Sequence, residues 1–130
     1  NTVINAGNST FPLTPKLDGV CDEVVLPLQE EGDSRALPLQ RLDLAVEFSI
    51  IAMGGEICVD YGHYIKSLSN TRRILPLGYS NDVIAYIPTV QILNEGGYEA
   101  ETSCPWFGLP GPFKPEIEDL VKDAVRKMVG

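Results

Sequence analysis

The chain is poor in histidine and cysteine. His63 is the only histidine among the 130 residues, so no His-rich metal site can be built from this chain alone. The three cysteines, Cys21, Cys58 and Cys104, lie far apart without a C-x-x-C spacing, which excludes a zinc ribbon and indicates no clear disulfide framework. We expect three reduced, mostly buried thiols, and one disulfide plus one free thiol is the alternative.

Basic residues and long apolar runs are also scarce. The formal net charge is −8, and Arg72-Arg73 is the only basic cluster, so the sequence offers no basic stripe for binding nucleic acid. The longest apolar run, Ile50 to Met53, is far too short to cross a bilayer. No signal-peptide pattern opens the chain, and its first residue is Asn, so we interpret it as a processed or excised piece.

The remaining composition is typical of a folded domain. Hydrophobic residues make up 44% of the chain, which is enough to bury a core in one domain or in part of a larger one. From Leu42 to Met53 apolar and polar residues alternate with the period of two that predicts a strand. Its last four residues are apolar on both faces, so burial is expected to increase toward Gly54-Gly55.

Two amphipathic helices and further strands follow. A helix over 56–68 and a packing helix over 116–129 show apolar residues at three- and four-residue spacing. A short helix is expected near 90–94, and residues 104–115 are expected to form a loop rich in Pro, Gly and aromatics. We predict an α/β fold in which these helices pack on a mixed β-sheet made from strands near 37–53, 74–79 and 83–87, the last two forming a hairpin.

The chain divides at about residue 37. Residues 1–37 have little periodicity, and we expect an irregular arm with one short edge strand near Pro27, because proline cannot donate to a sheet ladder. Residues 38–130 are expected to form the α/β domain.

Glu56 is the first candidate for chemistry. It follows the apolar strand and the two glycines, where a carboxylate is a plausible metal ligand or general base, although an acid that caps the helix is equally ordinary. Asp60 and His63 would share its helix face at i+4 and i+7, and we interpret these two as a solvated surface.

Aromatic residues supply the second set of candidates. Tyr79, Tyr86 and Tyr98 could coordinate a metal or donate a hydrogen bond to an oxyanion, and packing of the rings is the alternative. Another open choice concerns the loop near residue 110, whose aromatic side chains could line an acyl-chain groove or simply cover the edge of the core; they are Trp106, Phe107 and Phe113.

Four segments occur in a recognisable order and spacing. They are Met53-Gly54-Gly55-Glu56 leading into the helix, Gly78-Tyr79-Ser80-Asn81, Ala85-Tyr86-Ile87-Pro88-Thr89 and Gly97-Tyr98-Glu99-Ala100. Together they resemble the end of the catalytic domain of neutral/alkaline non-lysosomal ceramidases, with bacterial members of unassigned substrate the most similar. The resemblance covers roughly residues 38–129, and residues 1–37 are only loosely placed.

The resemblance implies a zinc-dependent amidohydrolase acting on N-acyl, ceramide-like lipid amides. Glu56 would be a zinc ligand, Tyr86 its phenolic partner, and Tyr98 would polarise the scissile carbonyl. Zinc would act as Lewis acid and as the source of the attacking hydroxide. The family also implies two histidine ligands from an upstream portion of the same protein, which would be this chain's partner, and a secreted or periplasmic location.

The sequence departs from the family in two places. Its turn has Gly54-Gly55-Glu56 where the family has Pro-Gly-Glu, which loosens the corner but keeps the carboxylate. The histidine-bearing portion is not in this chain, and His63 lies on the wrong side of the turn to replace it. We therefore expect an incomplete zinc site. The alternative is a non-catalytic structural or binding domain of the same fold, in which Glu56 only caps its helix.

Overall fold

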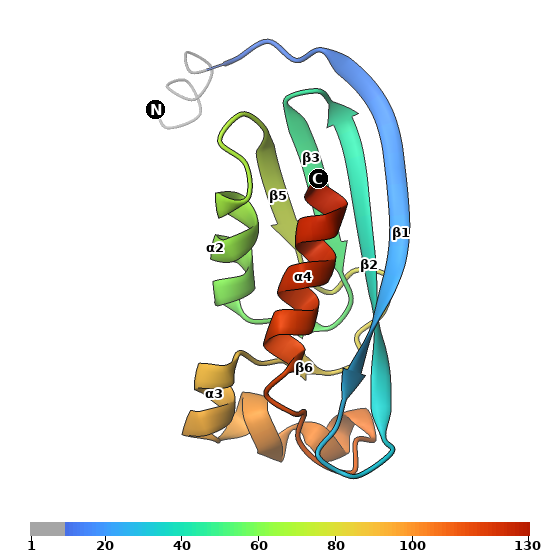
Figure 1. Cartoon of the computed structure of the whole chain (residues 1–130), viewed down its shortest axis with the longest axis vertical. Helices are drawn as coiled ribbons and strands as arrows, with labels where there is room; N and C mark the ends of the chain where they lie inside the picture. The colour runs from blue at the N-terminus through green and yellow to red at the C-terminus, as the bar shows by residue number, and fades with distance from the viewer. Residues whose placement is uncertain (1–9) are drawn as a thin grey trace.

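A four-stranded mixed sheet is the central element of the computed structural model, which describes residues 10–130 (Figure 1). The sheet order is β1-β2-β3-β5, with bounds Pro15–Pro27, Ser34–Ala45, Phe48–Met53 and Arg73–Leu77. Strands β1 and β2 are antiparallel, as are β2 and β3, whereas β3 and β5 are parallel. The predicted α/β fold with a mixed sheet is confirmed.

The first strand corrects the expected irregular arm. Residues 1–9 lie outside the described residues, but β1 covers Pro15–Pro27 and pairs with β2 from Pro27↔Ser34 to Pro15↔Ala45. Most of β1 is solvent-exposed, so it needs no alternating apolar residues, and its backbone bonds to β2 hold it instead. β1 lies at the edge of the sheet, as Pro27 predicted, and β2 runs across the expected boundary near residue 37.

The predicted single strand over 42–53 is in fact a hairpin. The chain turns at Val46 and Glu47, between β2 and β3. The two-residue turn contains no glycine, proline or asparagine, so it has none of the usual turn signals. The alternation of residues nevertheless assigned them to the correct faces of the sheet. The face that contains Asp43 and Ala45 is buried, and the face that contains Leu44 is exposed.

A second pair of strands corrects the prediction for residues 74–87. The expected hairpin is wrong, because β5 pairs with β3 in a parallel ladder. The segment that follows contributes β6 (Tyr86–Ile87), which pairs in parallel with β4 (Glu56–Ile57) as a separate two-stranded sheet. Parallel neighbours need a crossover, and helix α2 (Val59–Ser67) supplies it between β3 and β5.

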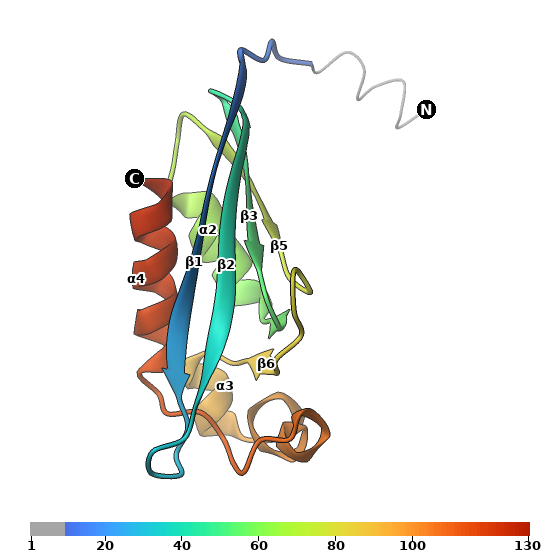
Figure 2. The same cartoon turned by 90° about the vertical axis from the view of Figure 1, so that its right-hand side faces the viewer.

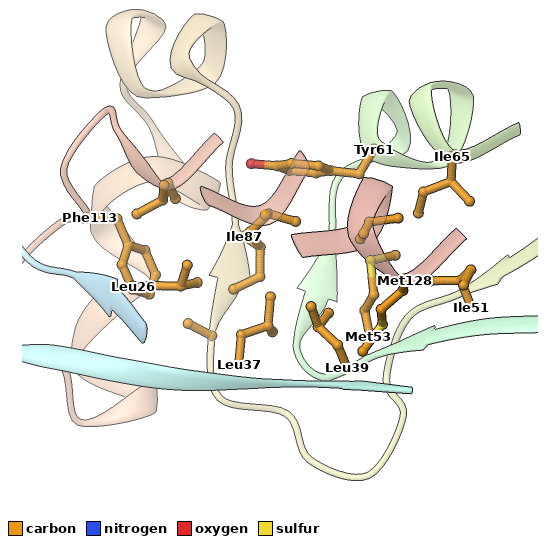
Figure 3. Packing of buried hydrophobic residues seen from close by; sticks show 14 of the residues in the cluster. Leu26, Leu37, Leu39, Ile51, Met53, Tyr61, Ile65, Ile87, Phe113 and Met128 are labelled. Carbon is orange, nitrogen blue, oxygen red and sulfur yellow. The ribbon is translucent and has the colours of Figure 1, made fainter. Parts of the chain in front are cut away.

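Two helices, α2 and α4 (Ile117–Val129), cover the same face of the sheet (Figures 1 and 2). In α4 the buried residues recur at three- and four-residue spacing, which confirms the helix predicted there. Figure 3 shows Tyr61 and Ile65 of α2 lying over Leu39 of β2 and Met53 of β3. The buried residues of α4 are Ile117, Val121, Val125 and Met128.

The opposite face of the sheet has no helix packed on it in the described residues (Figure 2). Pairing places Leu42, Ile50 and Leu75 in one row across β2, β3 and β5. Ile50 alternates with the buried Ile51, so this row points away from the helices, and Leu75 is 42% exposed. The sheet therefore presents an apolar outer row formed by Leu42, Ile50 and Leu75.

Shorter elements gather at one end of the sheet, the lower end in Figure 1. The predicted short helix is present as α3 (Val90–Glu95), whose N-cap Thr89 accepts a hydrogen bond from the backbone N–H of Ile92. The expected loop over 104–115 begins with a 3₁₀ helix. The short helices of this region lie near β6 (Figure 1). The two further short helices are η1 (Tyr98–Thr102) and η2 (Cys104–Phe107).

All three cysteines are free thiols. Cys104 is buried and Cys58 partly buried, but Cys21 is exposed on β1, so the expectation of mostly buried thiols is wrong for Cys21. Within residues 10–130, no helix combines the length and apolar character needed to cross a membrane.

Asp43 is a buried carboxylate surrounded by cations. It accepts a 2.6 Å hydrogen bond from Ser49, and basic nitrogens of Lys16, Arg41 and Arg72 lie 3.4, 3.4 and 3.6 Å from its oxygens. Burial alone raises its pKa, but the Ser49 hydrogen bond and the three cations outweigh that effect, so the pKa of Asp43 lies below its usual value.

Replacing Asp43 with Asn is expected to destabilise the fold by about 2 kcal/mol at neutral pH, because the three cations lose their shared counter-charge. A lowered pKa means that this stabilisation is present above the usual value of 3.8 and is lost as pH falls through the lower folded value. Urea denaturation at pH 7 and at lower pH should show the gap between wild type and Asp43→Asn closing in acid. A gap that stays constant would contradict this role of the charge.

Candidate functional site

The site begins at a glycine corner between β3 and β4. A Cβ at Gly54 would lie 2.7 Å from the ring of Pro38, and one at Gly55 would lie 2.7 Å from the carbonyl oxygen of Ala85. Gly55 also has φ of +82°, in the left-handed region that glycine adopts readily. The sequence therefore uses two glycines here because the backbone passes against two neighbouring segments.

The corner places Glu56 beside Tyr86. Backbone N–H groups of Gly55 and Glu56 donate to the carbonyls of Asp82 and Ala85, at 2.9 and 2.8 Å, which fixes the corner to the segment leading into β6. The parallel β4–β6 ladder then brings Glu56 and Tyr86 into register as direct partners. Both residues line one cavity of about 390 Å³, at the carboxyl end of the strands.

Tyr79 makes the closest contact with the carboxylate. Its hydroxyl donates a 2.6 Å hydrogen bond to Oε2 of Glu56. Because that bond favours the protonated phenol, it raises the pKa of Tyr79. Tyr79 also lines the cavity, so it belongs to the site together with Glu56 and Tyr86.

Tyr86 and Tyr98 form an aromatic pair. Their ring centroids are 5.5 Å apart in an edge-to-face arrangement, and the ring of Phe107 also packs edge-to-face against Tyr86, with centroids 6.0 Å apart. The neighbouring Glu56 carboxylate favours the protonated phenol and raises the pKa of Tyr86 to about 12. At neutral pH Tyr86 is therefore a protonated phenol in the described structure.

The cavity is acidic. Asp60, Glu95 and Glu99 line it together with Glu56, and none of its lining residues is Lys, Arg or His. Burial, followed by the charges of Glu99 and Asp60, raises the pKa of Cys58 to about 11, so this cavity-lining thiol stays protonated and is a poor nucleophile at neutral pH. The field of the cavity disfavours anions and favours neutral or cationic ligands.

The predicted helix face of Glu56, Asp60 and His63 does not exist. Glu56 lies on β4, before α2, and the N-cap of α2 is Cys58 without a side-chain capping bond. The interpretation of Glu56 as a helix cap is therefore wrong, since its strand pairing with Tyr86 replaces that role. His63 is exposed and lines a different pocket.

The aromatic residues near 104–115 divide between surface and core. Trp106 is 81% exposed, whereas Phe113 is buried in the core beside Leu26 (Figure 3). Phe107 contacts Tyr86, as described above. Of the two alternatives for these residues, the groove lined by all three rings is not formed, because their side chains point into different surroundings.

The sequence indicated Tyr79 only as one of three candidate phenols and gave no sign of its bond to Glu56. Its position in the loop after β5 gives no periodic signal, and its bond to Glu56 depends on the parallel pairing of β3 with β5. The nearest sequence signal is Gly78-Tyr79-Ser80-Asn81, where Tyr79 and Asn81 both have positive φ, at 53° and 69°. Asparagine is common in that region, but tyrosine is not.

The metal-ligand set of the described chain is incomplete. A catalytic zinc site usually has three protein ligands, and oxygen donors such as Glu56 suit it. Among residues 10–130, no group of three or more His, Cys, Asp and Glu side chains is placed to hold a metal ion. Glu56 and Tyr86 line the same cavity, as two ligands of one zinc ion must. Two ligands are too few for a catalytic zinc site, so these residues alone do not fit one.

Comparisons with known proteins add no family: no protein-family model matches the sequence, and neither a curated protein nor a solved structure matches it.

Proposed function

We propose that this chain is the part of a zinc-dependent amidohydrolase that contributes Glu56 and Tyr86 to the metal site and Tyr98 to catalysis. The observation that carries the proposal is the gathering of a carboxylate and two phenols, Glu56, Tyr79 and Tyr86, at one cavity, from segments up to 30 residues apart. Tyr98 does not line that cavity, but its ring packs against the ring of Tyr86. The resemblance to neutral ceramidases supports the same three residues. The substrate class is an N-acyl, ceramide-like amide.

Each residue has a distinct role in this proposal. When bound, zinc supplies Lewis-acid polarisation and a nucleophilic hydroxide. Glu56 and Tyr86 would hold the metal, and the acidic cavity that they line disfavours anionic competitors. Tyr98, whose ring packs against Tyr86, donates its hydroxyl proton in a hydrogen bond to the oxygen of the scissile carbonyl as negative charge develops there.

The missing ligands are proposed to come from an upstream portion of the same protein that bears two histidines. The apolar outer row of Leu42, Ile50 and Leu75 is the surface that we propose such a portion covers, because it is a contiguous row of apolar side chains on the face without a packed helix. The β5 strand of that row leads directly to Gly78 and Tyr79, so a segment packed on it would approach the cavity.

The proposal is tested by producing the chain with and without its upstream portion. Zinc content is measured by elemental analysis, and hydrolysis is followed with a fluorescent short-chain ceramide. We expect about one zinc per complete protein and turnover that a chelator abolishes, whereas this chain alone retains little zinc. A complete protein without zinc or turnover would reject the enzyme in favour of the non-catalytic domain.

Replacing Tyr98 with Phe is expected to lower kcat about 10²-fold, because one donor to the developing oxyanion is lost. KM should change little, since the ring and its packing against Tyr86 remain. Tyr64→Phe is the matched control, because the Tyr64 hydroxyl instead bonds the carbonyl of Lys122. Equal kcat values for both variants would remove Tyr98 from catalysis.

A further inference from the structure

Tyr79 has a backbone conformation that its side chain does not explain. Its φ of 53° lies in the left-handed region, which costs a residue with a Cβ roughly 1 to 2 kcal/mol. The side chain is 67% exposed, so burial in the core cannot offset that cost. Strain of this kind is found mostly at functional sites, where the surrounding structure enforces it.

The loop that carries Tyr79 is tied to the same corner as Glu56. The Tyr79 N–H donates to the Gly55 carbonyl at 2.9 Å, and the Ser80 N–H donates to the Met53 carbonyl at 3.1 Å. Both acceptors lie within three residues of Glu56. Backbone hydrogen bonds therefore connect the segment that carries the phenol directly to the segment that carries the carboxylate, which fixes the position of one relative to the other.

We propose that Tyr79 is a positioning residue that holds the Glu56 carboxylate in its working orientation. Its hydroxyl donates to Oε2, which restricts rotation of the carboxylate about its terminal bond. The direction of the other oxygen, Oε1, is thereby restricted as well. This role rests on the proposed function of Glu56, and it assigns Tyr79 a part that the ligand and catalytic residues do not have.

The contact itself can be tested on this chain without metal or substrate. Tyrosine labelled with carbon-13 at Cζ gives one NMR signal for each of the five tyrosines, and Tyr→Phe variants assign them. Glu56→Gln is expected to shift the Tyr79 signal, because the acceptor loses its charge. Tyr61 and Tyr64 are internal controls whose hydroxyls donate to backbone carbonyls, and their signals should stay in place.

Activity of the complete enzyme tests the consequence. Tyr79→Phe is expected to lower kcat about 10- to 100-fold with little change in KM, as is usual when a partner that orients a ligand is lost. If the Phe variant does not fold, Tyr79→Asn replaces it, because asparagine adopts positive φ more easily. An unchanged kcat in a folded variant would overturn the inference.

Failure of the inference and failure of the proposed function give different results. If the chemical shift of Tyr79 Cζ is the same in wild type and in Glu56→Gln, the positioning role is overturned, even if the complete enzyme is active. An inactive complete protein overturns the proposed function, and the NMR shift then reports only a structural contact. Because the positioning role requires both a shifted signal and a reduced kcat, a shift without loss of kcat also counts against it.

Discussion

Replacement of Glu56 by Gln should lower amide hydrolysis by the complete enzyme about 10²- to 10⁴-fold, because a bound metal contributes several kcal/mol of transition-state stabilisation and Gln is a poorer ligand than Glu. Gln keeps the shape of the side chain and can still accept the hydrogen bond from Tyr79. It lacks the negative charge with which a carboxylate binds a metal ion or accepts a proton. The expected loss is in kcat and is accompanied by a fall in bound zinc, measured on the same preparation.

Glu101→Gln is the matched control for this experiment. Glu101 is an exposed acid on η1, the element that carries Tyr98, and it does not line the cavity. The control tests whether loss of one negative charge, out of the 18 acidic residues in the whole chain, affects hydrolysis through net charge alone. If both variants hydrolyse the substrate as fast as wild type, Glu56 has no role in the reaction and the amidohydrolase proposal is rejected.

Replacement of Gly55 by Ala should destabilise the fold by about 2 to 5 kcal/mol, combining the cost of left-handed φ with that of overpacking. The added Cβ would lie 2.7 Å from the carbonyl oxygen of Ala85, which accepts the Glu56 N–H. Relief of that clash requires the β4–β6 ladder to separate. Thermal unfolding should therefore occur roughly 10 °C or more below wild type.

Gly32→Ala separates the two contributions to that cost. Gly32 has a similar φ of +87°, but a Cβ there would meet nothing within 4 Å. It is expected to lose only the conformational part, about 1 to 2 kcal/mol. Equal losses in the two variants, measured by urea denaturation, would show that close approach at Gly55 contributes nothing.

Elements with a complete local signal were predictable. The helix at 117–129 has apolar residues on one face, acids in its first turn and bases in its last, so its position within one residue followed from the sequence. The burial of Ile51 and Met53 before two glycines was equally visible. β1 was not, because a largely exposed edge strand carries no apolar alternation.

The candidate site was only partly predictable. Glu56 and Tyr86 were named from the sequence and do share a cavity, although that geometry leaves their chemical roles as predictions. The helix assigned to Glu56 was wrong, since nothing in Glu56-Ile57 indicates that it pairs with Tyr86-Ile87. Two-residue strands have no periodicity to detect.

The sequence by itself determined which stretches are apolar on one face, where the chain must bend at glycine, and that an acid follows the most buried strand. Tertiary structure alone decided that this acid meets Tyr79 and Tyr86, and that Asp43 is buried among cations. The reason is physical: periodicity records how the two faces of one element are solvated. Which distant segments pair depends on the free energy of contacts that form only when the whole fold is assembled.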